Sequence, residues 1–117
     1  MNNISQKLND LNNLVISGKL LEAFDKYYDD NVSMQENANV PTVGKKENYQ
    51  REIEFLDNIS EFRKAAVIDQ AIGDNISYVT WQYDYTHKQW GVRNYTQVSV
   101  QHWKDGKIVR EQFFYGN

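Results

Sequence analysis

The stretch QVSVQHWKDGKIVREQFFY, residues 97–115, carries the strongest structural signal in the chain. Its central Asp105-Gly106 dipeptide is typical of a tight β-hairpin turn, and the runs on either side are rich in β-branched and aromatic residues. The stretch therefore predicts a long antiparallel hairpin. Along the second strand Glu111 alternates with large apolar residues, so it is expected on the same inner face as they are. These neighbours are Val109, Phe113 and Tyr115.

The length of the turn decides which residues of the first strand lie beside Glu111, because a shift of one residue exchanges the two faces. A two-residue turn places a mostly apolar set there: Val98, Val100 and His102. A three-residue turn that includes Lys104 places a more polar set there: Ser99, Gln101 and Trp103. The longer turn leaves four apolar residues on the outer face, as expected if a homodimer buries that face. They are Val98, Val100, Ile108 and Phe114.

Upstream of the hairpin, the spacing of apolar residues predicts three helices and then a meander of strands. The first helix ends near Ser17-Gly18, the second runs from Leu20 to the turn-prone residues 29–31, and the third covers residues 45–58. A short strand, residues 32–36, separates the second helix from the third. Helices followed by a long meander predict an α+β domain, in which three N-terminal helices pack on the concave face of a curved antiparallel sheet.

Length and composition restrict the class of protein. The 117 residues suit a single domain, 1–117, with one core. The net charge of −3 and the lack of a basic stripe argue against a nucleic-acid partner. No apolar run is long enough to span a membrane. The polar amino terminus does not read as a signal peptide, so a cytoplasmic location is expected.

Three short motifs carry a resemblance to a known family: Tyr28-Asp29-Asp30-Asn31-Val32, residues 43–47 and residues 103–109. Their order and spacing, with the order of predicted elements, resemble the SnoaL-like branch of the nuclear transport factor 2-like superfamily across nearly the whole chain. The resemblance implies a cone-shaped fold with a pocket between sheet and helices, and it favours the register with Gln101 and Trp103 beside Glu111. Because this superfamily includes isomerases, cyclases, hydratases and non-catalytic binding proteins, the fold leaves the function open.

Glu111 and Glu36 are the candidate catalytic residues, because each is a carboxylate on a predicted apolar strand face. Burial raises the pKa of a carboxyl group toward the range where a general base works near neutrality. By resemblance, Glu36 occupies the position of the carboxylate base of ketosteroid isomerases. The same comparison puts Leu11 where those enzymes keep an oxyanion-hole tyrosine, so steroid isomerisation is not expected.

The candidate substrate-binding residues are the polar and aromatic side chains expected on the inner faces. They are Gln101, Trp103, Trp81, Tyr83, Met34, Phe113, Tyr115 and Tyr49. Glu52 is expected in solvent, with Arg51 available to pair with an inward glutamate. No cofactor motif is present, and the two histidines, His87 and His102, lack the spacing of a metal site.

The leading hypothesis is a protein that binds a small, largely apolar molecule and carries out general acid-base chemistry on it, as an isomerase, cyclase or hydratase. The alternative is a non-catalytic ligand carrier or dimeric interaction module in which both glutamates are structural. The sequence does not decide whether the protein is an enzyme.

Overall fold

Three helices and a six-stranded curved sheet make up the protein, which is described by a computed structural model over residues 3–116. The elements along the chain are α1 (Ile4–Ile16), α2 (Leu20–Tyr27), β1 (Tyr28–Glu36), β2 (Thr42–Val43), α3 (Lys45–Asp57), β3 (Ile59–Gly73), β4 (Ile76–His87), β5 (Gly91–Lys104) and β6 (Lys107–Tyr115). The α+β class and the element order predicted from the sequence are confirmed.

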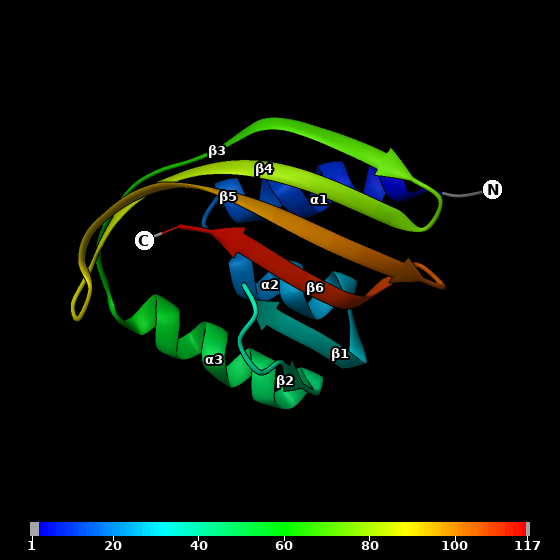
Figure 1. Cartoon of the computed structure of the whole chain (residues 1–117), viewed down its shortest axis with the longest axis horizontal. Coiled ribbons are helices and arrows are strands. Elements are labelled where there is room, and N and C mark those ends of the chain that lie inside the picture. Colours follow the sequence, from blue (N-terminus) through cyan, green and yellow to red (C-terminus); the bar gives the residue numbers. More distant parts are fainter. Residues whose placement is uncertain (1–2, 117) are drawn as a thin grey trace.

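The sheet has the strand order β2-β1-β6-β5-β4-β3, and the long strands curve around the helices (Figure 1). β1 pairs with β6 in parallel, whereas the other neighbours are antiparallel. The sheet is therefore mixed, not wholly antiparallel as predicted. Its register shifts three times between β3 and β4, and such bulges increase the bend and twist of a sheet.

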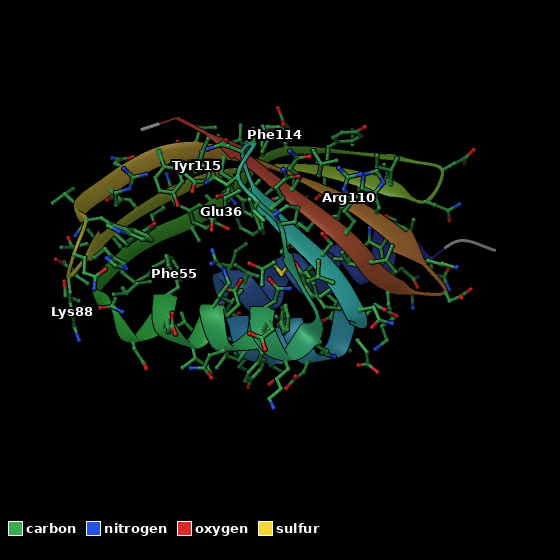
Figure 2. All side chains as sticks on the ribbon, turned by 60° about the horizontal axis from the view of Figure 1, so that its bottom comes forward. Glu36, Phe55, Lys88, Arg110, Phe114 and Tyr115 are labelled. Carbon is green, nitrogen blue, oxygen red and sulfur yellow. The ribbon has the colours of Figure 1, made fainter. Side chains whose placement is uncertain are left out.

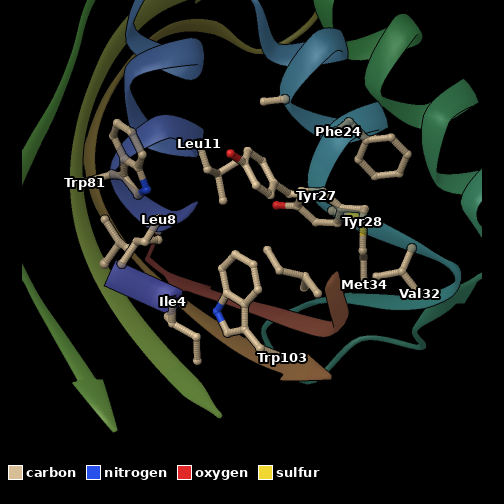
Figure 3. Close-up of a cluster of buried hydrophobic side chains, with 13 residues drawn as sticks. Ile4, Leu8, Leu11, Phe24, Tyr27, Tyr28, Val32, Met34, Trp81 and Trp103 are labelled. Carbon is tan, nitrogen blue, oxygen red and sulfur yellow. The ribbon is translucent and has the colours of Figure 1, made fainter. Parts of the chain in front are cut away.

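The core lies where α1 and α2 meet the inner face of the sheet (Figure 3). On α1, Ile4, Leu8 and Leu11 are buried at helical spacing. The chain passes from α2 into β1 at Tyr28, and residues 29–31 form the irregular beginning of β1, not a separate turn. This irregularity brings Tyr28 into the core.

The hairpin between β5 and β6 combines a two-residue turn with the register predicted for a longer one. Lys104 pairs with Lys107, and both turn residues have positive φ, 53° at Asp105 and 79° at Gly106, as in a type I′ turn. Beyond the turn, Trp103 pairs with Ile108 but His102 pairs with Arg110, so Val109 is an extra residue. The bulge therefore lies within β6, at the third residue after the turn.

Because of this bulge, two predictions about the hairpin faces are wrong. Ile108, expected on the outer face, is completely buried in the core, and Val109 interrupts the alternation that was expected to place it with Glu111. Beyond the bulge the predicted faces hold: Gln101 lies opposite Glu111 and Ser99 opposite Phe113. Phe114, on the opposite face of β6 from Glu111 and Phe113, is 44% exposed (Figure 2).

Helix α3 is rotated relative to the predicted orientation. Tyr49 was expected on an inner face as a candidate binding residue, but the inward face contains Asn48, Glu52 and Phe55. Asn48 is buried because its side-chain amide donates hydrogen bonds to the backbone carbonyls of Val32, Thr42 and Gly44. These bonds satisfy a polar group that a hydrophobic pattern assigns to the surface. None of the helices in the described part of the chain is long and apolar enough to cross a membrane.

Candidate functional site

A cavity of about 270 Å³ lies between the inner face of the sheet and the three helices. Apolar and aromatic side chains form most of its wall, and a few polar groups interrupt them, as in many small-molecule sites. The polar wall residues, other than tyrosines, are Asn12, Glu36, Arg51, Glu52, Arg93, Gln97, Ser99, Gln101 and Glu111.

Glu111 lies in the buried part of the cavity wall, where its residue is only 2% exposed. The Tyr28 hydroxyl donates a hydrogen bond to its Oε1, and Gln101 Nε2 donates to its Oε2 at 2.9 Å. A carboxylate has about four acceptor positions, so two donors leave it able to accept a proton from a bound molecule. The carboxylate is thus both oriented and accessible from the cavity.

Gln101 is itself held by a second layer of hydrogen bonds. Ser77 Oγ donates to Gln101 Oε1 at 2.6 Å, and Trp103 Nε1 donates to Ser77 Oγ at 2.9 Å. Because its oxygen is occupied by Ser77, the amide must present its N–H groups to Glu111. The chain Trp103–Ser77–Gln101 therefore fixes which atom faces the carboxylate.

Burial raises the pKa of Glu111 from 4.5 to about 7, and the hydrogen bonds from Tyr28 and Gln101 oppose that rise. Burial, followed by the charge of Glu111, raises the pKa of Tyr28 well above its usual range, so its hydroxyl keeps the donated proton. Near neutral pH, Glu111 exchanges a proton readily while its tyrosine neighbour remains neutral.

Glu52 is a second carboxyl group whose pKa is raised by burial. The expectation from the sequence that it lies in solvent is wrong. The rotation of α3 brings it into the cavity wall, partly buried. Burial, followed by the charges of Glu111 and Glu36, raises its pKa to about 7. Glu52 and Glu111 therefore disfavour each other's ionisation.

Glu36 lines the more exposed part of the cavity, and its side chain is 38% exposed. It forms a salt bridge of 2.7 Å with Arg51, the pairing considered from the sequence, and it accepts a hydrogen bond from Tyr115. The carboxylates of Glu36 and Glu111 have different surroundings: Glu36 is neutralised by a cation, whereas Glu111 has only neutral donors.

Aromatic residues of β4, β5 and β6 form one wall of the cavity. Trp81 and Tyr83 stack with ring centroids 5.3 Å apart, and the hydroxyls of Tyr85 and Tyr95 are 2.9 Å apart. Burial raises the pKa of Tyr83 far above 10, so its hydroxyl is a neutral donor. Within residues 3–116, that hydroxyl makes no hydrogen bond to another side chain or to the backbone.

The cavity brings together most of the residues predicted to form a site. Those in its wall are Glu111, Glu36, Gln101, Trp81, Tyr83, Met34, Phe113 and Tyr115. Trp103 lies behind the wall, bonded to Ser77 and in edge contact with Tyr27. Tyr49 lies outside because of the rotation of α3, and it packs against Phe24 instead.

Sequence reasoning did not select Tyr28, Ser77, Asn12 or Arg93 as site residues. Two of them could have been found from the alternation of residues along a strand. Ser77 lies on the same face of β4 as Trp81, and Arg93 lies on the same face of β5 as Tyr95. Tyr28 is 83 residues from Glu111 in the chain, and only the parallel β1–β6 pairing brings them together.

His87 has a structural setting at the turn between β4 and β5. It stacks on Trp90 with ring centroids 3.7 Å apart, and its Nδ1 accepts the backbone N–H groups of Gln89 and Trp90. Burial, followed by the charge of Arg93, lowers its pKa. No group of three or more potential metal-ligating side chains occurs within residues 3–116.

The sequence pattern of the SnoaL-like domain matches residues 3–115, which include all nine helices and strands. The chain belongs to the SnoaL-like domain family. The family predicted from the sequence is thereby confirmed. None of the functionally curated protein sequences is significantly similar to this SnoaL-like protein.

Solved structures with the same fold include proteins described as SnoaL-like polyketide cyclases and one described as an isomerase. A protein described as a SnoaL-like polyketide cyclase from Mesorhizobium loti has a TM-score of 0.87 at 24% identity, covering 98% of this chain and 100% of its own. A protein described as an isomerase from Bacillus subtilis has a TM-score of 0.73 at 18% identity, covering 99% and 90%. Bal32a, from a soil-derived mobile gene cassette, has a TM-score of 0.81 at 10% identity, covering 97% and 88%. At these identities the likeness shows the fold alone.

Proposed function

We propose that this SnoaL-like protein binds a small, largely apolar molecule in the cavity and that Glu111 acts on it as a general base and acid. The observation that carries the proposal is the setting of Glu111 in the cavity wall. Its carboxylate is buried, oriented by Tyr28 and Gln101, and has a pKa raised to about 7. A base with a pKa close to the working pH is both deprotonated in part and strong enough to remove a proton.

The reaction class that fits is removal of a proton from carbon beside a carbonyl group, followed by its return at another position. The Glu111 carboxylate would take the proton, and the electron pair would move to the carbonyl oxygen as an enolate. The neutral hydroxyl of Tyr83 is a candidate donor to that oxygen because it lines the same cavity without another partner among the described residues. Return of the proton from Glu111 would complete an isomerisation.

The experiment uses 5-nitrobenzisoxazole, a small planar probe that reports proton abstraction from carbon. The base removes the C3 proton, the N–O bond breaks, and the electron pair leaves on oxygen as the coloured 2-cyano-4-nitrophenolate. Glu111→Gln is expected to lower kcat/KM by about a hundredfold. Glu54→Gln is the matched control, because Glu54 is an exposed glutamate on α3, and it should leave the rate unchanged.

Two further readouts separate chemistry from folding. The parent rate should rise with pH through about 7 as Glu111 ionises, and circular dichroism should show that Glu111→Gln keeps the parent fold. Equal rates for parent and Glu111→Gln, with both folded, would exclude Glu111 as the base. Tight binding of the probe with no turnover above that of free carboxylate would favour a ligand carrier, in which both glutamates are structural.

A further inference from the structure

Two side-chain polar atoms in the described part of the chain are buried without a hydrogen-bond partner: Asn12 Oδ1 and Arg93 Nε. Both residues line the same cavity. Since a buried polar group without a partner costs free energy, we infer that two of them on residues that line one cavity have their partners on a bound molecule. Their chemistry then describes that molecule.

Arg93 lies on β5 eight residues from Gln101, the residue opposite Glu111, and so away from that carboxylate. Its guanidinium carbon is 4.9 Å from the ring centroid of Tyr95, and no carboxylate among residues 3–116 forms a salt bridge with it. Its charge acts on the aromatic end of the cavity, which we define by Tyr95 and Tyr115. Burial raises the pKa of both tyrosines, and Arg93 opposes each rise. Arg93 is not among the causes that shift the pKa of Glu52 or Glu111.

The other arginine in the wall cannot take the same role. Arg51 is already paired with Glu36 at 2.7 Å, so its charge is compensated within the protein. Arg93 is thus an uncompensated cation in a partly buried, aromatic setting, where a guanidinium binds a carboxylate or other anionic oxygen most strongly. An anionic oxygen placed there also lies away from the Glu111 carboxylate, which would repel it.

Asn12 supplies a second polar contact on the opposite, helical side of the cavity. It is 5% exposed, and its Nδ2 donates to Gln70 Oε1 at 3.0 Å, which fixes the amide and leaves Oδ1 as the atom without a partner. A hydroxyl group on the ligand suits this position, because it donates to Oδ1.

We propose that the ligand of this cavity is an apolar, ring-containing molecule that bears an anionic oxygen, bound by Arg93, and a hydroxyl group, bound by Asn12. This inference rests on the proposed function, since it takes the cavity as the binding site. It adds the ligand class and two specificity-determining residues. The anionic group anchors the ligand at the aromatic end and directs its apolar body toward Glu111.

The test compares naphthalene probes that share one ring system, by isothermal titration calorimetry at pH 8. 2-Naphthoate is expected to bind the parent about tenfold more tightly than the neutral 2-naphthamide, a difference that one charge-assisted hydrogen bond supplies. Arg93→Met should remove that preference. Arg110→Met is the matched control, because Arg110 is exposed on β6, and it should retain the preference.

The second arm tests Asn12 with 6-hydroxy-2-naphthoate, which is expected to bind the parent severalfold more tightly than 2-naphthoate. Asn12→Leu should remove the gain from the hydroxyl, whereas Asn13→Ala, at an exposed position on α1, should keep it. Thermal unfolding of each variant checks that it is folded before binding is measured.

The outcomes separate this inference from the proposed function. Equal affinity of the parent for 2-naphthoate and 2-naphthamide, or an unchanged preference in folded Arg93→Met, would overturn the anionic-ligand inference while leaving Glu111 as the base. If none of the naphthalene probes binds the parent, the anionic-ligand inference fails, whereas the proposed function is decided separately by the rate with 5-nitrobenzisoxazole.

Discussion

Gln101 and Glu111 lie directly opposite each other on β5 and β6, and Gln101 Nε2 donates a hydrogen bond of 2.9 Å to Glu111 Oε2. The pair exists because Val109 is an extra residue in β6, which brings the polar face of β5 against the carboxylate. Without that bulge, a two-residue turn would place His102 near Glu111. The local chemistry of the site therefore depends on one backbone irregularity.

The free energy of unfolding should fall with rising pH because of Glu111. Its pKa is raised from 4.5 in the unfolded chain to about 7 in the folded one, so the folded state binds more protons between these values. The stability contributed by the protonated carboxyl is complete below pH 4.5 and is lost as the pH rises through about 7. The shift corresponds to roughly 3 kcal/mol. Urea unfolding of parent and Glu111→Gln between pH 4 and 8 should show curves that diverge by that order, and parallel curves would contradict the raised pKa.

Tyr28→Phe should move the pH midpoint of the 5-nitrobenzisoxazole reaction upward. The Tyr28 hydrogen bond lowers the pKa of Glu111, so its removal makes the carboxylate harder to form. The phenylalanine ring retains the stacking against Phe24, whose centroid lies 4.7 Å away. The measurement is kcat/KM against pH, with Tyr78→Phe, an exposed tyrosine on β4, as the control. A midpoint identical to that of the parent would show that Tyr28 does not stabilise the carboxylate.

Glu52→Gln should move the same midpoint downward. Removing a nearby carboxylate eliminates the repulsion between the two charges, so Glu111 ionises at lower pH. The opposite directions expected for Glu52→Gln and Tyr28→Phe distinguish electrostatic coupling from a general loss of structure, which would affect both variants alike. Glu54→Gln again serves as the control on α3. An unshifted profile in Glu52→Gln would show that the two carboxyl groups titrate independently.

Gly106→Ala should lower the free energy of unfolding by about 1 kcal/mol, since an alanine at positive φ is strained. Gly106 has φ 79°, and an added Cβ would lie 3.4 Å from Lys7 Cε. The control is Gly116→Ala, because a Cβ there would meet nothing within 4 Å. Thermal unfolding of both variants provides the comparison. Equal stability would mean that the turn accommodates a side chain without strain.

A homodimer through the outer sheet face is a further prediction from the sequence. In the structure, an outer patch of four apolar side chains lies on paired positions of β4, β5 and β6: Tyr78, Val98, Val100 and Phe114. Light scattering of the parent should give the mass of two chains, and Phe114→Lys should give that of one. Val92→Lys, an exposed apolar position 72% accessible and outside the outer patch, is the control. A monomeric parent would contradict the dimer.

The helices, the meander and the inward position of Glu111 could be predicted from the sequence, because each rests on a local period. Ile4, Leu8 and Leu11 repeat every three or four residues, as a helix requires, and Asp105-Gly106 can adopt the positive φ angles of a tight turn. Glu111 could be assigned to the inner face because Phe113 and Tyr115 follow it at the strand period.

The tertiary structure alone decided the rest, because it depends on partners far apart in the chain. Asn48 is buried because it finds three backbone carbonyls, and that burial rotates α3 so that Glu52 enters the cavity. Tyr28 meets Glu111 only through the parallel pairing of β1 with β6. A periodic pattern records which face of an element is apolar, but it does not record which polar groups find hydrogen-bond partners once the elements pack. Hydrogen bonding across the sheet therefore set the surroundings of Glu111 in the hairpin that residues 97–115 specify.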